Sequence, residues 1–168
     1  PHSGKYVVFY SLWSTTNQYD KIYYSYANDD FTDITEPKVL FDDTKAAIDG
    51  DIVYNKEDGL FHLFYKSEAG GGIYQATTKS IHPEPGQKPG EHWTKIPTRV
   101  EVSRNAVEGV GVCQAIDGKS WIVMSDCYTA GHYQFCTSQD LKTFKFVQDT
   151  KTQGVFTPRH GTMIPITQ

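Results

Sequence analysis

The sequence predicts a fold made only of β-strands, arranged as a β-propeller with four-stranded antiparallel blades. Aromatic residues make up 14% of the chain and alternate with Val and Ile in short runs, a composition that is typical of strands. No long window carries apolar residues at positions i, i+3, i+4 and i+7, so little helix is expected. A tight turn followed by a strand recurs three times along the chain, as it does in propeller blades.

The clearest strands are only a few residues long and are bounded by Gly, Asp, Asn or Ser. They are residues 6–10, 22–26, 52–54, 61–65, 121–124 and 133–136. Strands of this length, separated by residues that favour turns, are typical of antiparallel hairpins. Trp93 and Trp121 fall at the centres of predicted strands, and we expect both to belong to the core.

The repeat is defined by three turn glycines, Gly4, Gly59 and Gly118, which are 55 and 59 residues apart. A β-sandwich would also contain many short strands, but it would not place the same turn in register three times. The predicted units are residues 4–45, 46–104 and 105–150, with the opening of a further blade at 157–168. Because closed propellers usually have at least four blades, the 168 residues are expected to form a single partial propeller domain.

Charge and composition exclude several classes of function. The 16 basic and 20 acidic side chains give a formal net charge of −4 without any Lys/Arg cluster, so no nucleic-acid partner is expected. The longest nearly apolar run, residues 6–13, is far shorter than the roughly 20 residues of a membrane-spanning helix, so no membrane partner is expected. Three cysteines without C-x-x-C spacing indicate free thiols rather than a zinc site or a disulfide framework.

Two acidic residues hold matching places in the repeat. Asp49 lies ten residues before Gly59, and Glu108 lies ten residues before Gly118. Each acid belongs to the strand that precedes the turn, which is the innermost strand of a blade and lines the central channel. We therefore expect the two carboxyl groups to occupy one structural position in adjacent blades and to share the channel.

A pair of acids in a narrow channel suits the cleavage of a glycosidic bond. Repulsion and partial desolvation raise the pKa of one member, which can then donate a proton at neutral pH. One carboxyl group protonates the leaving oxygen, and a second activates water from the opposite face of the sugar. The alternative is that these acids only hydrogen-bond the backbone of a hydrated pore. Trp13 is the candidate platform for a sugar ring, unless it packs between blades.

With these residues identified, the sequence resembles the glycoside hydrolases of family 43, which are five-bladed propellers and include arabinofuranosidases, xylosidases and arabinanases. The resemblance covers the whole chain and is carried by residues 4–11, 47–52, 107–109 and 158–162. It implies an inverting hydrolase that releases arabinofuranosyl or xylosyl units from plant polysaccharides or oligosaccharides. From that carbohydrate substrate, a secreted, periplasmic or cell-surface location is expected.

The resemblance also implies roles for individual residues. Family members use a general base, an acid that tunes and orients, and a general acid. By resemblance Glu108 is the general acid and Asp49 the tuning residue, with Asp51 as the alternative because it lies two residues further along the same strand. Arg159 and His160 resemble the family's pore-lining substrate-binding pair, with His160 near a water or a structural calcium ion at the propeller axis. No cofactor is required for the reaction.

The general base is the departure from the family pattern. In the family it lies on the first blade, and the tenth position before Gly4 would lie upstream of Pro1. We therefore expect the 168-residue chain to be inactive alone and a longer parent protein to be the enzyme. A carbohydrate-binding propeller that does not cleave is the alternative function. A third is a retaining furanosidase acting on sucrose or fructans, with catalytic carboxyl groups about 5 Å apart. The oligomeric state is left open.

Overall fold

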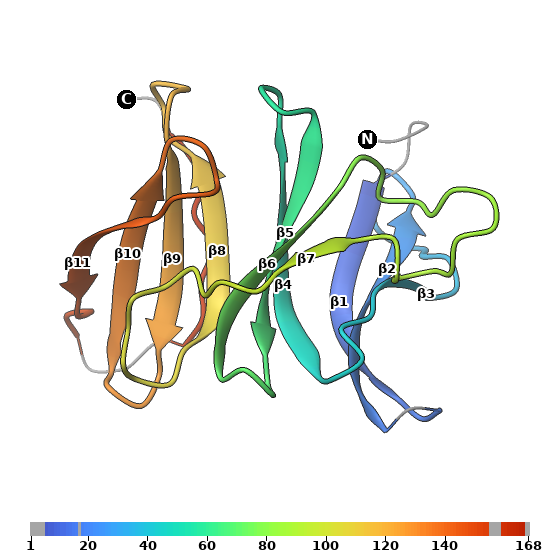
Figure 1. Ribbon diagram of the computed structural model, residues 1–168, viewed down its shortest axis with the longest axis horizontal. Coiled ribbons are helices and arrows are strands. Elements are labelled where there is room, and N and C mark those ends of the chain that lie inside the picture. Colours follow the sequence, from blue (N-terminus) through green and yellow to red (C-terminus); the bar gives the residue numbers. More distant parts are fainter. Residues whose placement is uncertain (1–5, 17, 155–158, 167–168) are drawn as a thin grey trace.

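The computed structural model describes residues 6–16, 18–154 and 159–166. Its eleven strands form three antiparallel sheets that stand side by side (Figure 1). No helix occurs within these ranges, and accordingly they hold no helix that is long and apolar enough to cross a membrane. The predicted all-β class is confirmed, and the sheets are arranged as consecutive propeller blades.

Each sheet consists of strands that follow one another in the chain, in the orders β1-β2-β3, β4-β5-β6-β7 and β8-β9-β10-β11. Their bounds are β1 (Tyr6–Ser14), β2 (Tyr19–Ala27), β3 (Lys38–Phe41), β4 (Ala47–Asn55), β5 (Leu60–Ser67), β6 (Gly72–Thr78), β7 (Thr94–Ile96), β8 (Glu108–Gln114), β9 (Trp121–Cys127), β10 (His132–Ser138) and β11 (Lys145–Thr150). Neighbouring sheets meet mainly through β4, the first strand of the second sheet, which contacts β1 of the first sheet and β8 of the third.

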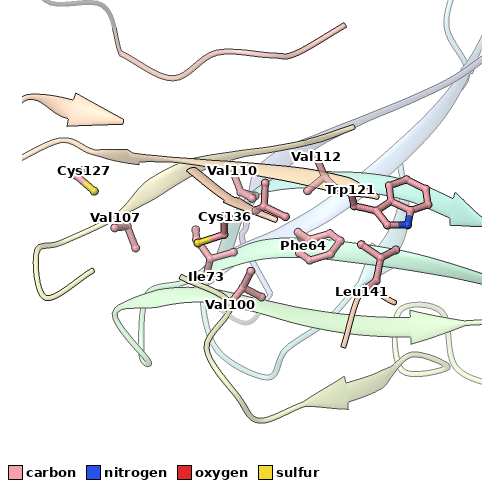
Figure 2. Packing of buried hydrophobic residues seen from close by; sticks show 11 residues of the cluster. Phe64, Ile73, Val100, Val107, Val110, Val112, Trp121, Cys127, Cys136 and Leu141 are labelled. Carbon is pink, nitrogen blue, oxygen red and sulfur yellow. The ribbon is translucent and has the colours of Figure 1, made fainter. Parts of the chain in front are cut away.

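Two hydrophobic clusters fill the spaces between the sheets. β5 contributes to both, because the consecutive residues Leu63 and Phe64 point to opposite faces of the strand. Leu63 belongs to the cluster shared with the first sheet, and Phe64 to the cluster shared with the third sheet (Figure 2). Trp93 and Trp121 are only 5% and 6% exposed, which confirms their predicted place in the core. They are not at strand centres, because Trp93 directly precedes β7 and Trp121 is the first residue of β9. The three cysteines are free thiols, as predicted.

The second and third sheets have four strands each, and each contains a glycine at positive φ in its first hairpin. Gly59 and Gly118 have φ angles of 70° and 67° in the hairpins that join the first two strands of their sheets, a conformation that glycine adopts without steric cost. The first sheet has three strands in the described part of the chain, one fewer than predicted. Residues 159–166, expected to open a further blade, contain no strand. Gly4 and residues 157, 158, 167 and 168 lie outside the described ranges.

The first sheet exposes an apolar side chain whose counterpart in the third sheet is buried. The loop after β10 directs Leu141, at a φ of 54°, into the core between the second and third sheets. The loop after β2 places Phe31 at a φ of 56°, yet Phe31 is 56% exposed and packs on Tyr6 with ring centroids 4.8 Å apart. The neighbours differ, because Leu141 packs against the preceding sheet whereas no described sheet precedes the first.

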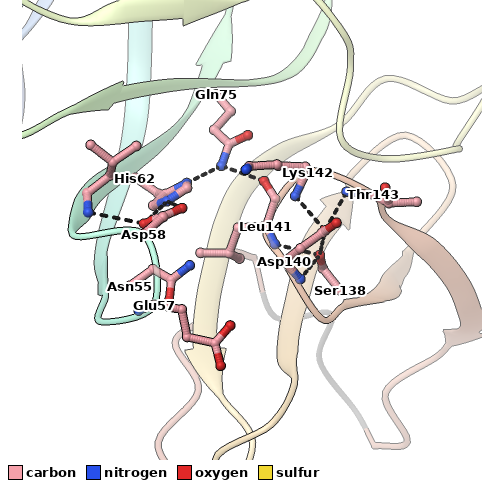
Figure 3. Close-up of polar contacts among 11 residues, drawn as sticks. Asn55, Glu57, Asp58, His62, Gln75, Ser138, Asp140, Leu141, Lys142 and Thr143 are labelled. Carbon is pink, nitrogen blue, oxygen red and sulfur yellow. Dashed lines mark hydrogen bonds and ion pairs between the residues drawn. The ribbon is translucent and has the colours of Figure 1, made fainter.

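A polar network joins the second sheet to the third (Figure 3). His62 in β5 is 1% exposed, and its Nε2 and Nδ1 atoms lie 3.1 Å from Asp58 Oδ2 and 2.7 Å from Gln75 Nε2. Gln75 Nε2 also donates to the Leu141 carbonyl oxygen at 3.0 Å. Because the amide nitrogen only donates, His62 Nδ1 accepts, and the proton of the neutral ring lies on Nε2. Burial lowers the pKa of His62, and the opposing attraction of Asp58 does not cancel this shift.

We predict that the free energy of unfolding decreases as the pH falls below about 6.5. The unfolded His62 takes up a proton in this range, whereas the folded His62, with its lowered pKa, does not, so acid favours unfolding. Urea denaturation between pH 7.5 and 5 measures the slope, which should be smaller in His62→Gln. Some slope should remain, because burial also lowers the pKa of His92. A slope unaffected by the substitution would contradict this prediction.

Candidate active site

The two predicted acids lie at β-bulges in the innermost strands of the second and third sheets. The register shifts after Ile48 in β4 and after Glu108 in β8. The first bulged residues, Asp49 and Gly109, have φ angles of 52° and 55°. Such a bulge bends the strand and redirects a side chain. Glycine tolerates this conformation readily, whereas an aspartate in it indicates local strain that the surrounding contacts must offset.

The pairing corrects the expected equivalence of the two acids. Glu108 corresponds to Ile48, since each is the last residue paired before its bulge, and the shift between the two is 60 residues. The turn glycines are 59 residues apart, so counting back from them is wrong by one. Asp49 corresponds to Gly109 rather than to Glu108. The two acids still come together, because the bulge brings Asp49 Oδ2 to 3.0 Å from the Gly109 amide of β8.

Asp49, Glu108 and His160 each place one side-chain atom within 4.8 Å of the others. His160 Nε2 lies 3.0 Å from Glu108 Oε1 and 3.8 Å from Asp49 Oδ2. The Arg159 guanidinium donates to the same Glu108 oxygen. The acid side chains are 18% and 20% exposed, whereas those of Arg159 and His160 are nearly half exposed. The cluster therefore has a desolvated floor and an opening to water.

Asp49 also links the cluster to the first sheet. Its backbone amide donates to Ser11 Oγ of β1 at 3.2 Å, so all three sheets meet at this residue. Trp13 lies two residues beyond Ser11, on the same side of β1, because side chains alternate along a strand. The Trp13 side chain is 60% exposed. This exposure excludes the alternative of packing between the described sheets and leaves its ring accessible to a ligand.

Asp51 occupies a different environment from Asp49. Its carboxylate accepts hydrogen bonds from the Val112 amide of β8 at 2.6 Å and from the Ile52 amide at 2.9 Å. Burial raises the pKa of Asp51, although both hydrogen bonds act in the opposite direction. Asp51 thus closes the seam between β4 and β8. The group of atoms within 4.8 Å of one another contains Asp49 and not Asp51, so the geometry favours Asp49 as the partner of Glu108.

Asp126 in β9 belongs to the site, although the sequence analysis does not identify it. It pairs with Glu108 across the β8–β9 ladder, is 3% exposed and accepts hydrogen bonds from Arg159 Nε and the His160 amide. One signal could have identified it, because an acid in an otherwise largely apolar strand must find buried donors.

The donor set does not by itself fit a calcium ion. Calcium takes 6 to 8 oxygen ligands, whereas the cluster among the described residues offers two carboxylates and one imidazole nitrogen. The positive Arg159 guanidinium also contacts Glu108 and would repel a cation there. The chemistry of this site is therefore built on the groups of the protein, and calcium near His160 stays a prediction.

Comparisons with known proteins agree with this fold. A family model described as a probable glycosyl hydrolase domain matches residues 1–168. No curated protein matches the chain. Among solved structures, a thermostable family-43 glycoside hydrolase aligns with a TM-score of 0.59 and 16% sequence identity, over 86% of this chain and 51% of that chain.

Two fructofuranosidase structures from Schwanniomyces occidentalis are also similar. The complex with fructosylnystose has a TM-score of 0.62 and 16% identity, over 90% of this chain and 32% of that chain. The complex with fructosyl-erythritol has a TM-score of 0.54 and 15% identity, over 89% of this chain and 35% of that chain. At these identities the likeness shows the fold alone. The chain spans about half the length of the family-43 hydrolase and a third of the fructofuranosidases.

We predict that Gly109→Ala disturbs the site directly. A Cβ atom at this position would lie 2.9 Å from His160 Cγ and Cδ2, and its positive φ disfavours a side chain. The free energy of unfolding should fall by about 1–3 kcal/mol, and the NMR signals of His160 should shift. Gly118→Ala is the matched control, because φ is also positive there but no atom lies within 4 Å. It should lose stability with His160 unchanged, and His160 shifts in both variants or in neither would contradict the prediction.

Proposed function

Because this chain belongs to the family of probable glycosyl hydrolase domains, whose model covers residues 1–168, we propose that it forms part of a glycosidase active site. The observation that carries the proposal is the approach of Asp49, Glu108 and His160 to within 4.8 Å of one another. A carboxyl group at a partly desolvated opening, with a second carboxyl group beside it, can act as the proton donor that glycosidic bond cleavage needs.

In this proposal Glu108 is the general acid that protonates the leaving oxygen. Its side chain is 18% exposed, so a sugar oxygen can reach it, while contacts with Arg159 and His160 fix its orientation. Asp49 orients and tunes Glu108. Because one Asp49 oxygen already accepts the Gly109 amide, its carboxylate is held in a defined direction beside the acid.

The separation of the two carboxyl groups excludes one assignment within an inverting mechanism. An inverting acid and base are roughly 6.5–9.5 Å apart, because a water molecule must fit between the base and the sugar. Asp49 and Glu108 are within 4.8 Å of each other and leave no such room. Asp49 is therefore not the inverting base, and we assign the base to a blade that precedes this chain in a longer parent protein.

We propose arabinofuranosyl or xylosyl units of plant polysaccharides or oligosaccharides as the substrate, with the exposed Trp13 ring as the stacking surface for a sugar. A substrate of this kind places the protein outside the cytoplasm, in a secreted, periplasmic or cell-surface location. The fold that the chain shares with family-43 and fructofuranosidase structures is compatible with this class of ligand.

Two observations favour alternatives. The short distance between Asp49 and Glu108 also suits a retaining furanosidase, in which acid and nucleophile are about 5–5.5 Å apart. Glu108 is already bound by Arg159 and His160, an arrangement that also suits a carbohydrate-binding propeller in which these groups hold a sugar without cleaving it.

We predict that Glu108→Ala lowers the hydrolysis rate of the longer parent protein by about 100-fold or more, which is the usual contribution of a general acid. The assay uses arabino- and xylo-oligosaccharides. Glu57→Gln, in the exposed turn between β4 and β5, should retain the parental rate. The 168-residue chain alone should be inactive, and NMR of the first product should show the inverted anomer.

The other outcomes separate the alternatives. A robust rate from a verified 168-residue chain would contradict the assignment of the base to a preceding blade. Retention of the anomeric configuration would replace the inverting mechanism with the retaining one. Binding of oligosaccharides by the parent protein, without any cleavage, would favour the carbohydrate-binding propeller.

A further inference from the structure

Asp126 stands directly opposite Glu108 in the β8–β9 ladder, so the two side chains project from the same face of the third sheet. Like charges directly across a ladder destabilise a sheet unless a cation lies between them. Arg159 supplies that cation, because its Nε atom donates to Asp126 Oδ2 at 2.8 Å while its terminal nitrogen contacts Glu108. The Tyr128 ring lies 4.9 Å from the guanidinium carbon and adds a cation–π contact.

The same Asp126 oxygen holds the neighbouring residue as well. Oδ2 accepts the backbone amide of His160 at 3.0 Å, and Tyr133 donates its hydroxyl to the His160 carbonyl oxygen at 2.7 Å. His160 has a φ of 55°, a strained conformation that persists only where surrounding contacts fix it. One buried carboxylate thus anchors both residues that bind the Glu108 carboxyl group.

Asp126 itself is not placed to react. It is 3% exposed, and the two hydrogen bonds on Oδ2 turn its charge toward the protein rather than toward the opening. Its hydrogen bond is also the largest influence that raises the pKa of the Arg159 guanidinium, ahead of the charge of Glu108. Arg159 thus bridges the two acids, and Asp126, with a side chain 4% exposed against 18% for Glu108, is the more deeply buried end of the bridge.

We propose that Asp126 is a positioning residue for the proton donor, acting on Glu108 through Arg159 and His160. This inference rests on the proposed function for the role of Glu108, whereas the anchoring of Arg159 and His160 by Asp126 does not. The two parts can therefore be tested separately, one by catalysis in the parent protein and the other by the structure of the 168-residue chain.

The catalytic test compares two leaving groups in the parent protein. An oligosaccharide needs a proton on the departing oxygen, whereas a 2,4-dinitrophenyl glycoside of the same sugar departs without one. In Asp126→Asn we expect kcat to fall by about 100-fold on the oligosaccharide and by less than about fivefold on the activated glycoside. Asp149→Asn is the matched control, because Asp149 lies in the same sheet and accepts from Gln134. It should leave both rates unchanged.

Equal losses on both substrates, or no loss on either, would overturn the positioning role of Asp126. Glu108→Ala tests the proposed function in the same assay, because it should show the same dependence on the leaving group. If Glu108→Ala loses no activity on the oligosaccharide, the general-acid assignment fails. If only Glu108→Ala shows the dependence, that assignment stands and the positioning role falls alone.

The structural test uses the 168-residue chain and needs no activity. Asp126→Ala removes the acceptor of the His160 amide, so hydrogen exchange of that amide should accelerate by roughly tenfold or more. Asp149→Ala should leave it unchanged. If Asp126→Ala does not fold, Asp126→Val, which also lacks an acceptor but leaves less empty space, serves for the same measurement. Unchanged exchange at His160 in a folded Asp126 variant would overturn the anchoring.

Discussion

Hydrogen bonds from backbone amides to partly buried carboxylates fix how the third sheet sits against the second, and the candidate site depends on this seam. Asp49 accepts the Gly109 amide and Asp51 accepts the Val112 amide. Sliding β8 along β4 by one residue would break both contacts at once, and a partly desolvated carboxylate that loses its donor is costly. The seam therefore has one register, and that register places Glu108 beside Asp49.

Much of the fold could be predicted because local patterns determine it. Alternation of aromatic and β-branched residues gives the strands, and the turns that precede them give the repeat. The burial of Trp93 and Trp121 follows from their size and apolar surface. The missing strand of the first sheet and the absence of a strand at 159–166 did not follow, because pairing depends on a neighbouring segment rather than on the residues of the segment itself.

The site could be predicted in part. Counting from turn glycines selected Asp49 and Glu108. The two hairpin turns have the same length, but Gly118 lies one position earlier in its turn than Gly59 does, so the count does not align equivalent residues. The bulge at Asp49 was not expected, because a non-glycine residue at positive φ is uncommon. Asp126 was not predicted from the sequence, for another reason. Its partners, Arg159 and His160, lie more than thirty residues further along the chain, and no spacing rule links residues so distant.

The seam between β4 and β8 also constrains the sequences of the two strands unequally during evolution. β4 must retain acids at two positions, whereas β8 contributes peptide groups that almost every amino acid possesses. At position 112 proline alone lacks the hydrogen that Asp51 receives. Apart from Glu108 and Gly109, side chains along β8 can thus diverge in response to other demands, such as the shape of a ligand, while its attachment to the preceding sheet is preserved.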